Sequence, residues 1–224
     1  MAGLLLPGTA GPAQVLSGYT ASGAAGLGFG GTAAPAPVAW PSGGLSALRI
    51  ASTSAEALGV TVVTSGDALA LILQCYDTTT VSGVSGAGAT WTKLQQAANG
   101  SDAELWLGIG ASAGTQAVTV SLSATTAALS LTLVEVAGLT STSQVVASYQ
   151  STGTSTIMTA PSISPAAPSN LLLYSAATTG TAPSGTPALL VGGMIVSPGT
   201  SALQPTWALS ASTAWAVVAT QIGA

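Results

Sequence analysis

The residues from Ala103 to Leu139 read AELWLGIGASAGTQAVTVSLSATTAALSLTLVEVAGL, and most of their apolar residues alternate with Ser, Thr, Gly or an acid. An alternation with a period of two is typical of β-strands that bury one face. The turn at ASAGT and the short break at ATT divide the stretch into three expected strands. The apolar residues expected to share a face within each strand are Leu105, Leu107 and Ile109, then Val118, Val120 and Leu122, and finally Leu129, Leu131 and Leu133.

Three consecutive strands joined by short breaks predict an antiparallel meander, whose apolar face needs a second layer. In GVTVVTSGDALALILQCYD we expect two strands around a turn at residues 65–67, the second of them central because it is apolar on both faces. TTTVSGVSGAGAT is expected to be a long loop, whereas WTKLQQ, NLLLYSAAT and AWAVVATQIG are expected strands, and SQVVASYQ and STIMTA weaker ones. The sequence therefore predicts an all-β protein, an antiparallel β-sandwich or jelly-roll-like domain.

Residues 1–45 differ in composition from the rest of the chain. They are rich in Gly, Ala and Pro, which disfavours regular strands and helices. Large apolar side chains are nevertheless spaced along them, unlike in most disordered segments. We predict an extended N-terminal docking arm at 1–45 and a β-sandwich domain at 46–224. The expected arm anchors are Leu4, Leu5, Leu6, Phe29 and Trp40.

Charged residues make up 4% of the chain, against about 25% in an average protein, and Arg49 and Lys93 are the two cations beside six acids. Binding to nucleic acid requires clustered Lys and Arg, so we expect none. The longest apolar run, at residues 68–73, is far shorter than a bilayer-spanning helix, and no membrane insertion is expected. The single cysteine, Cys75, is expected to point into the core.

Catalytic residues are hard to assemble from this sequence. It contains no histidine, so a Ser-His-Asp or Cys-His arrangement is impossible. Asp102 and Glu104 are two residues apart and would point to the same side of a strand, as a carboxylate pair or a cation site would require. The alternative that we favour is a solvated start of a strand, because acids are usually exposed. We therefore expect no enzyme, no metal and no cofactor.

Glu135 is the acid with the least usual position. It continues the series of Leu129, Leu131 and Leu133, so it approaches the core face of its strand. A buried carboxylate needs a partner, and Lys93 and Arg49 are the two cations in the chain. We predict a structural ion pair between Glu135 and Lys93, with Arg49 as the alternative partner.

Trp106 and Trp91 are the candidate contacts for a ligand or a partner. Trp106 shares a strand face with Glu104, and Trp91 opens the preceding strand. Indole rings bind sugar rings while neighbouring polar groups bind the hydroxyls, so Trp106, Trp91 and Glu104 could contact a host surface glycan. The alternative is that the tryptophans fill the second layer of the sandwich.

Five motifs occur in order along the chain: Gly-Asp before an apolar strand, Trp-Thr-Lys, Glu-Leu-Trp, Val-Glu-Val and Asn-Leu-Leu. Their order resembles a β-sandwich module of structural proteins from tailed bacteriophages and of some bacterial surface proteins. The resemblance covers about residues 60–222 and leaves the arm outside. It implies a virion component, assembled in the host cytoplasm, and it carries no catalytic residues.

Three functions remain open on this basis. The first is a minor tail protein that docks by its arm, presents the sandwich and contacts other virion proteins and itself as a homo-oligomer. The second is a capsid decoration protein, which would repeat across the head lattice. The third is a carbohydrate-binding module that reads host glycans.

Overall fold

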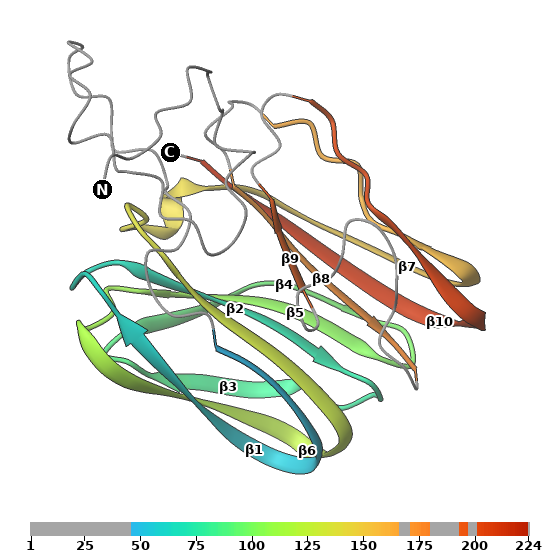
Figure 1. Ribbon diagram of the computed structural model, residues 1–224. Helices are drawn as coiled ribbons and strands as arrows, with labels where there is room; N and C mark the ends of the chain where they lie inside the picture. The colour runs from blue at the N-terminus through green and yellow to red at the C-terminus, as the bar shows by residue number, and fades with distance from the viewer. Residues whose placement is uncertain (1–45, 166–170, 180–192, 197–200, 224) are drawn as a thin grey trace, which may run out of the picture. The chain divides into compact units, whose positions relative to one another are not determined.

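The computed structural model describes residues 46–165, 171–179, 193–196 and 201–223 (Figure 1). All of them belong to one compact unit, Pro35–Ala224. Within these residues there are ten β-strands and one short 3-10 turn, η3 (Thr142–Gln144), and no α-helix. The strands are β1 (Ser46–Val62), β2 (Ala68–Cys75), β3 (Val81–Gly86), β4 (Thr90–Ala98), β5 (Asp102–Ile109), β6 (Gly114–Val136), β7 (Val145–Thr159), β8 (Leu171–Thr178), β9 (Gly193–Val196) and β10 (Thr206–Ile222).

The strands form two antiparallel sheets that pack face to face. The six-stranded sheet has the order β1-β6-β2-β5-β4, with β3 also paired to β6, and the four-stranded sheet has the order β7-β10-β8-β9. Ile72 and Leu105 of the first sheet lie in one buried cluster with Leu173 and Val218 of the second. This arrangement confirms the predicted all-β, sandwich-like class.

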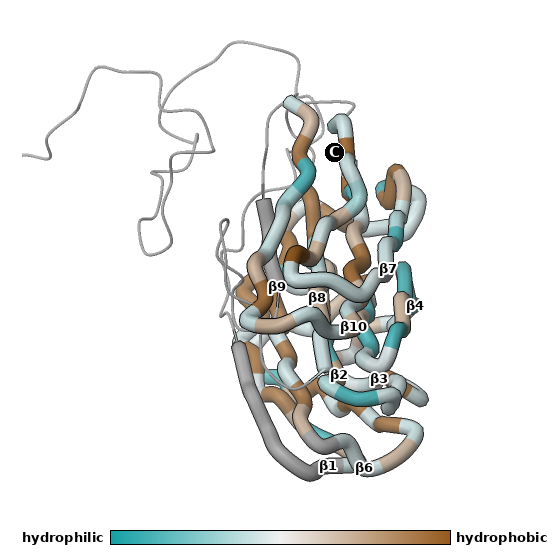
Figure 2. Tube along the Cα trace, turned by 90° about the vertical axis from the view of Figure 1, so that its right-hand side faces the viewer, coloured by the Kyte–Doolittle hydropathy of each residue, from teal (hydrophilic) through white to brown (hydrophobic). Residues whose placement is uncertain are grey.

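Strand β2 is the central strand that the sequence predicts. All eight of its residues are buried, and it pairs with β6 on one side and β5 on the other. Ala70 and Ile72 face the four-stranded sheet, while Leu71 and Leu73 face a second cluster on the opposite side. Figure 2 shows the alternation behind this packing, with apolar residues (brown) interleaved with paler ones along the strands.

The six-stranded sheet bends over itself to enclose that second cluster. Along the β1–β6 pair the register shifts between Thr53 and Ala55, whose partners in β6 are Thr126 and Ser121. The two halves of β6 flank this irregularity, and their inward residues, such as Val120 and Leu131, lie in the same cluster. A bulge bends a strand and increases its twist, which is how one strand contributes to two layers.

Three predictions about the six-stranded sheet are wrong. The break at ATT does not end a strand, because β6 continues through it as the bend. The meander is also incorrect, since β2 lies between β5 and β6 in the sheet. The segment TTTVSGVSGAGAT is not one long loop either: it contains β3, whose small polar residues pair with the first half of β6 and stay partly exposed.

The β7–β10 pair is bent in a similar way. Its register shifts between Ala208 and Thr213, and the two predicted strands SQVVASYQ and STIMTA are one strand, β7. Met158 and Trp207, beyond the shift, join Tyr174 of β8 in a third buried cluster. Burial of Trp207 and Trp215 confirms the alternative in which tryptophans fill the sandwich, for these two residues.

Gly153 makes room for a tryptophan on the neighbouring strand. It pairs with Trp215, whose ring lies where a side chain at position 153 would be, and Trp215 Nε1 donates to Ser155 Oγ at 3.0 Å. A Cβ at Gly153 would lie 2.8 Å from Cε2 of Trp215. Cross-strand contact of an aromatic ring with glycine is a known way to stabilise a strand.

Changing Gly153 to alanine is therefore expected to lower the free energy of unfolding by about 1–3 kcal/mol, the usual cost of overpacking. Gly59→Ala is the matched control, because nothing lies within 4 Å of a Cβ added there. Urea unfolding of the two variants measures the difference, and equal stabilities would show that the Trp215 ring moves freely.

Candidate functional site

The predicted contact residues lie together on neighbouring strands at one end of the six-stranded sheet. Trp91 and Lys93 come from β4, and Glu104 and Trp106 come from β5. Lys93 is paired with Trp106 across the two strands, and Trp91 with Gly108. All four side chains lie on the face of the sheet that packs against the second buried cluster, where the two rings are partly buried.

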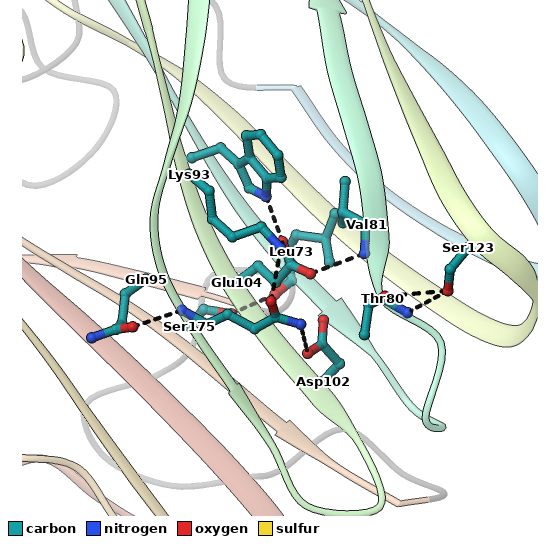
Figure 3. A network of polar contacts seen from close by, with 11 residues as sticks. Leu73, Thr80, Val81, Lys93, Gln95, Asp102, Glu104, Ser123 and Ser175 are labelled. Atoms are coloured by element: carbon teal, nitrogen blue, oxygen red, sulfur yellow. Dashed lines mark hydrogen bonds and ion pairs between the residues drawn. The ribbon is translucent and has the colours of Figure 1, made fainter.

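The Glu104 carboxylate is fully buried and is occupied by three donors (Figure 3). Oε1 accepts the backbone N–H of Val81, at the start of β3, at 2.9 Å. Oε2 accepts Trp106 Nε1–H at 2.6 Å and lies 2.9 Å from Lys93 Nζ. Glu104 and the Trp106 N–H are thus bound to each other, and neither is presented to a sugar hydroxyl.

Lys93 completes this group of side chains and corrects the ion pair predicted from the sequence. Its ammonium pairs with Glu104, donates to Gln96 Oε1 at 2.8 Å and lies 5.1 Å from the centre of the Trp106 ring. A cation over an indole ring gains further electrostatic stabilisation. The predicted pair of Lys93 with Glu135 is wrong, because β2 and β5 separate their strands in the sheet.

Glu135 is buried, as its register predicts, but backbone groups satisfy it. Its carboxylate accepts the N–H of Val63 at 2.9 and 3.1 Å and the N–H of Thr64 at 3.1 Å, in the turn after β1. Successive backbone N–H groups at a turn form a ready anion site, so the carboxylate needs no cation. Arg49, the alternative partner, has a side chain outside the described residues.

Asp102 is fully buried next to Glu104, which contradicts the interpretation of this pair as a solvated start of a strand. Burial, reinforced by a hydrogen bond with Glu104, raises the pKa of Asp102 to about 8, although Gln96 Nε2 donates to its Oδ1 at 2.7 Å. Within the described residues, no donor faces Oδ2. The arrangement fits an Asp102 carboxyl that retains its proton at neutral pH.

A second pair of carboxyl groups, Asp67 and Glu135, lies near the start of β2. Asp67, expected from the sequence to bond its own turn, accepts the N–H of Gly138 at 3.4 Å and lies beside Glu135. Burial is the main cause that raises the pKa of Asp67, and the proximity of Glu135 adds to it. Glu104 thus joins β5 to the start of β3, and Glu135 joins β6 to the turn after β1.

The remaining sequence predictions have mixed outcomes. Cys75 is buried in the core as predicted, and burial raises the pKa of its thiol. The arm anchors Leu4, Leu5, Leu6, Phe29 and Trp40 lie outside the described residues, so the arm and its boundary stay predictions. In the described part of the chain, no three His, Cys, Asp or Glu side chains gather closely enough to hold a metal ion.

Comparison with known proteins adds no further identification. No family model matches the chain, and no curated protein or solved structure matches it either. Within the described ranges, no helix has the length and apolar character needed to cross a membrane. The contacts of the buried carboxyl groups show one role: they accept hydrogen bonds and hold strands together.

Proposed function

We propose that this chain is a structural component of a tailed-phage virion, a minor tail protein that docks by residues 1–45 and presents the β-sandwich. The order of its five motifs resembles that class of protein, and one observation about its surface supports the proposal. Among the charged residues whose side chains the structure describes, none is exposed.

The charged side chains that the structure describes are buried or half-buried. All six acids and Lys93 are described: Asp67, Asp102, Glu104 and Glu135 are buried, and Glu56, Asp77 and Lys93 are half-buried. The exposed surface of the strands consists mainly of Ser, Thr, Ala, Gly and Gln. The Ser, Thr and Gly residues are among the pale segments in Figure 2.

Such a surface suits a subunit of a permanent assembly. Free soluble proteins use surface charge to prevent association, and a domain that lacks it is poorly protected as a monomer. Uncharged hydroxyl-rich surfaces can be buried against neighbouring subunits without the desolvation cost of charges. The buried carboxylates have no access to a substrate, and this supports a role without catalysis.

A glycan-binding role receives less support. It required Trp106, Trp91 and Glu104 to present a ring face with hydrogen-bonding groups at its rim. Glu104 is buried and the Trp106 N–H is directed at it, while Trp91 Nε1 donates to the backbone carbonyl of Gly86 at 3.1 Å. These polar groups are satisfied within the domain, so a sugar would meet partly buried rings with few free partners.

Antibody labelling of purified phage particles in the electron microscope tests the proposal. An antibody raised against the full chain is expected to label the tail. Labelling spread over the head would identify a capsid decoration protein instead. Particles that bind no antibody, from a lysate in which the chain is abundant, would contradict a virion role.

A further inference from the structure

Strand β7 is an edge strand of the four-stranded sheet. It pairs with β10 on one side, and within the described residues no strand lies on its other side. An edge strand offers unpaired backbone N–H and C=O groups to any other strand that approaches. The register with β10 is regular from Ala147 to Ser155, so the backbone there is well placed for pairing.

This edge carries no charge or proline that would protect it against pairing. Its sequence, VVASYQSTGTSTIMT, contains no charged residue and no proline. Natural edges are commonly protected by Lys, Pro or bulges. Among the described residues the exposed large hydrophobic side chains are Val63, Val146, Tyr149 and Ile157, and three of these four lie on β7.

Other edges in the described part of the chain differ from β7. Strand β4 carries Lys93, β1 carries Arg49 and Glu56, and β9 is only four residues long. Strand β3 is uncharged, but it contains two glycines and a register shift. The regular segment 147–155 of β7 therefore combines length and neutrality in a way that these edges do not.

Irregularities limit the open segment at both ends. Val146 has no partner opposite it in β10, because the register shifts between Gln221 and Ile222, so it forms a bulge. At the other end, Asn99 Nδ2 donates to the carbonyl oxygen of Gly153 at 2.8 Å. The uninterrupted open edge runs from Ala147 to Thr152.

We propose that the open edge of β7, within residues 147–152, pairs antiparallel with the same edge of a second copy of this chain, across a two-fold axis at Tyr149, Gln150 or Ser151. This inference names the self-contact of the assembly proposed above, and it rests on that proposal for its biological role. The result is a continuous eight-stranded sheet, built from two four-stranded sheets.

A second copy is the partner that the chemistry of this edge favours. Opposite residues of an antiparallel pair project from the same face, so a two-fold axis between the strands must pass midway between one residue and the same residue of the other copy. Any charge near the axis would therefore face a like charge. The open edge holds Ala, Ser, Tyr, Gln and Thr, so self-pairing places no like charges together.

Sedimentation of the full chain, from micromolar to millimolar concentration, tests this inference with lysine variants. Gln150 and Thr152 are exposed, and the double variant Gln150→Lys/Thr152→Lys brings four ammonium groups to the junction. We expect self-association to weaken about ten-fold or more. The matched control is Thr119→Lys, an exposed residue of β6 that has paired strands on both sides, Ala57 in β1 and Ser85 in β3.

The control variant is expected to associate like the wild type. The inference is overturned if the wild-type chain has the mass of one copy at every concentration, if the double variant associates as strongly as the wild type, or if the control weakens equally. Circular dichroism of each variant verifies folding.

Cysteine substitution provides a second test that does not depend on weakening the contact. Cys75 is buried, so a new thiol at Tyr149, Gln150 or Ser151 reacts without competition from it. Directly opposite residues have Cα atoms about 4.5–5.5 Å apart, which suits a disulfide. The variant at the axis should form a covalent dimer on mild oxidation. Absence of a dimer from all three would contradict the inference, and neither experiment depends on whether antibodies label a phage tail.

Discussion

Replacing Glu104 with alanine is expected to lower the free energy of unfolding by about 2–4 kcal/mol, because each buried donor that loses its acceptor costs about 1–3 kcal/mol. The change leaves the Lys93 ammonium, the Val81 N–H and the Trp106 N–H without their acceptor. It also releases the start of β3 from β5. A buried donor without an acceptor destabilises the folded state, because it has lost its hydrogen bond to water and gained none in the protein.

Two further variants separate this effect from a general loss of charge. Glu56→Gln removes an acid that is only half-buried, and it should change stability by less than about 0.5 kcal/mol. Lys93→Met keeps the aliphatic contact with Trp106 and leaves Glu104 with two donors, so an intermediate loss is expected. Denaturant unfolding ranks the three, and a Glu104→Ala variant as stable as Glu56→Gln would refute the structural role of this carboxylate.

The second large effect expected is a decrease in stability as the pH rises from about 4 to about 8. Asp102 has a pKa of about 8 in the folded protein, against an ordinary value of 3.8, because it is buried beside Glu104. Between those values the folded protein retains a proton that the unfolded chain has lost. Stability therefore falls with rising pH, by about 1.4 kcal/mol per pH unit for each retained proton. The raised pKa of Asp67 acts in the same direction.

Asp102→Asn tests the assignment of this pH dependence. An amide keeps the neutral character of the protonated acid and the contact with Gln96, but it cannot ionise. The variant should match the wild type near pH 5, exceed it in stability at pH 9 and show a flatter pH profile. Urea unfolding at pH 5, 7 and 9 measures both proteins. A wild-type stability that increases with pH would show that Asp102 is ionised in the folded state.

Elements with a strong local pattern could be predicted from the sequence, and β2 illustrates why. Its run of apolar residues on both faces is what a central strand requires, and the structure buries every residue of it. The turn at residues 65–67 was equally legible, since Gly66 has a φ of 95° that favours glycine. The burial of Glu135 followed from its register with Leu131 and Leu133.

Features that depend on contacts distant in sequence could not be predicted in this way. The order of β5, β2 and β6 is set by pairing between strands that are not consecutive, so the expected meander was wrong. Strand β3 was missed because its Ser and Gly residues are typical of loops. Asp102 and Glu104 are preceded by Asn-Gly-Ser, which suggests solvent, whereas β3 and the bent β6 bury the face on which they lie.

One signal in the sequence could have corrected the interpretation of the acids. Asp102, Glu104 and Trp106 project from the same face of β5, and an indole on that face argues for partial burial. Lys93, on the expected neighbouring strand, was a closer cation for Glu104 than for Glu135. The partner of Glu135 had no comparable signal, because backbone N–H groups leave no residue-specific pattern.

Quantifying the chain in purified particles by mass spectrometry tests most directly the central claim, that this sandwich with few charges is a permanent virion subunit. We predict that it co-purifies with the particles at a fixed low ratio to the main capsid protein, in a multiple set by the symmetry of the tail. A chain that stays in the soluble fraction of the lysate and is absent from the particles would contradict that claim.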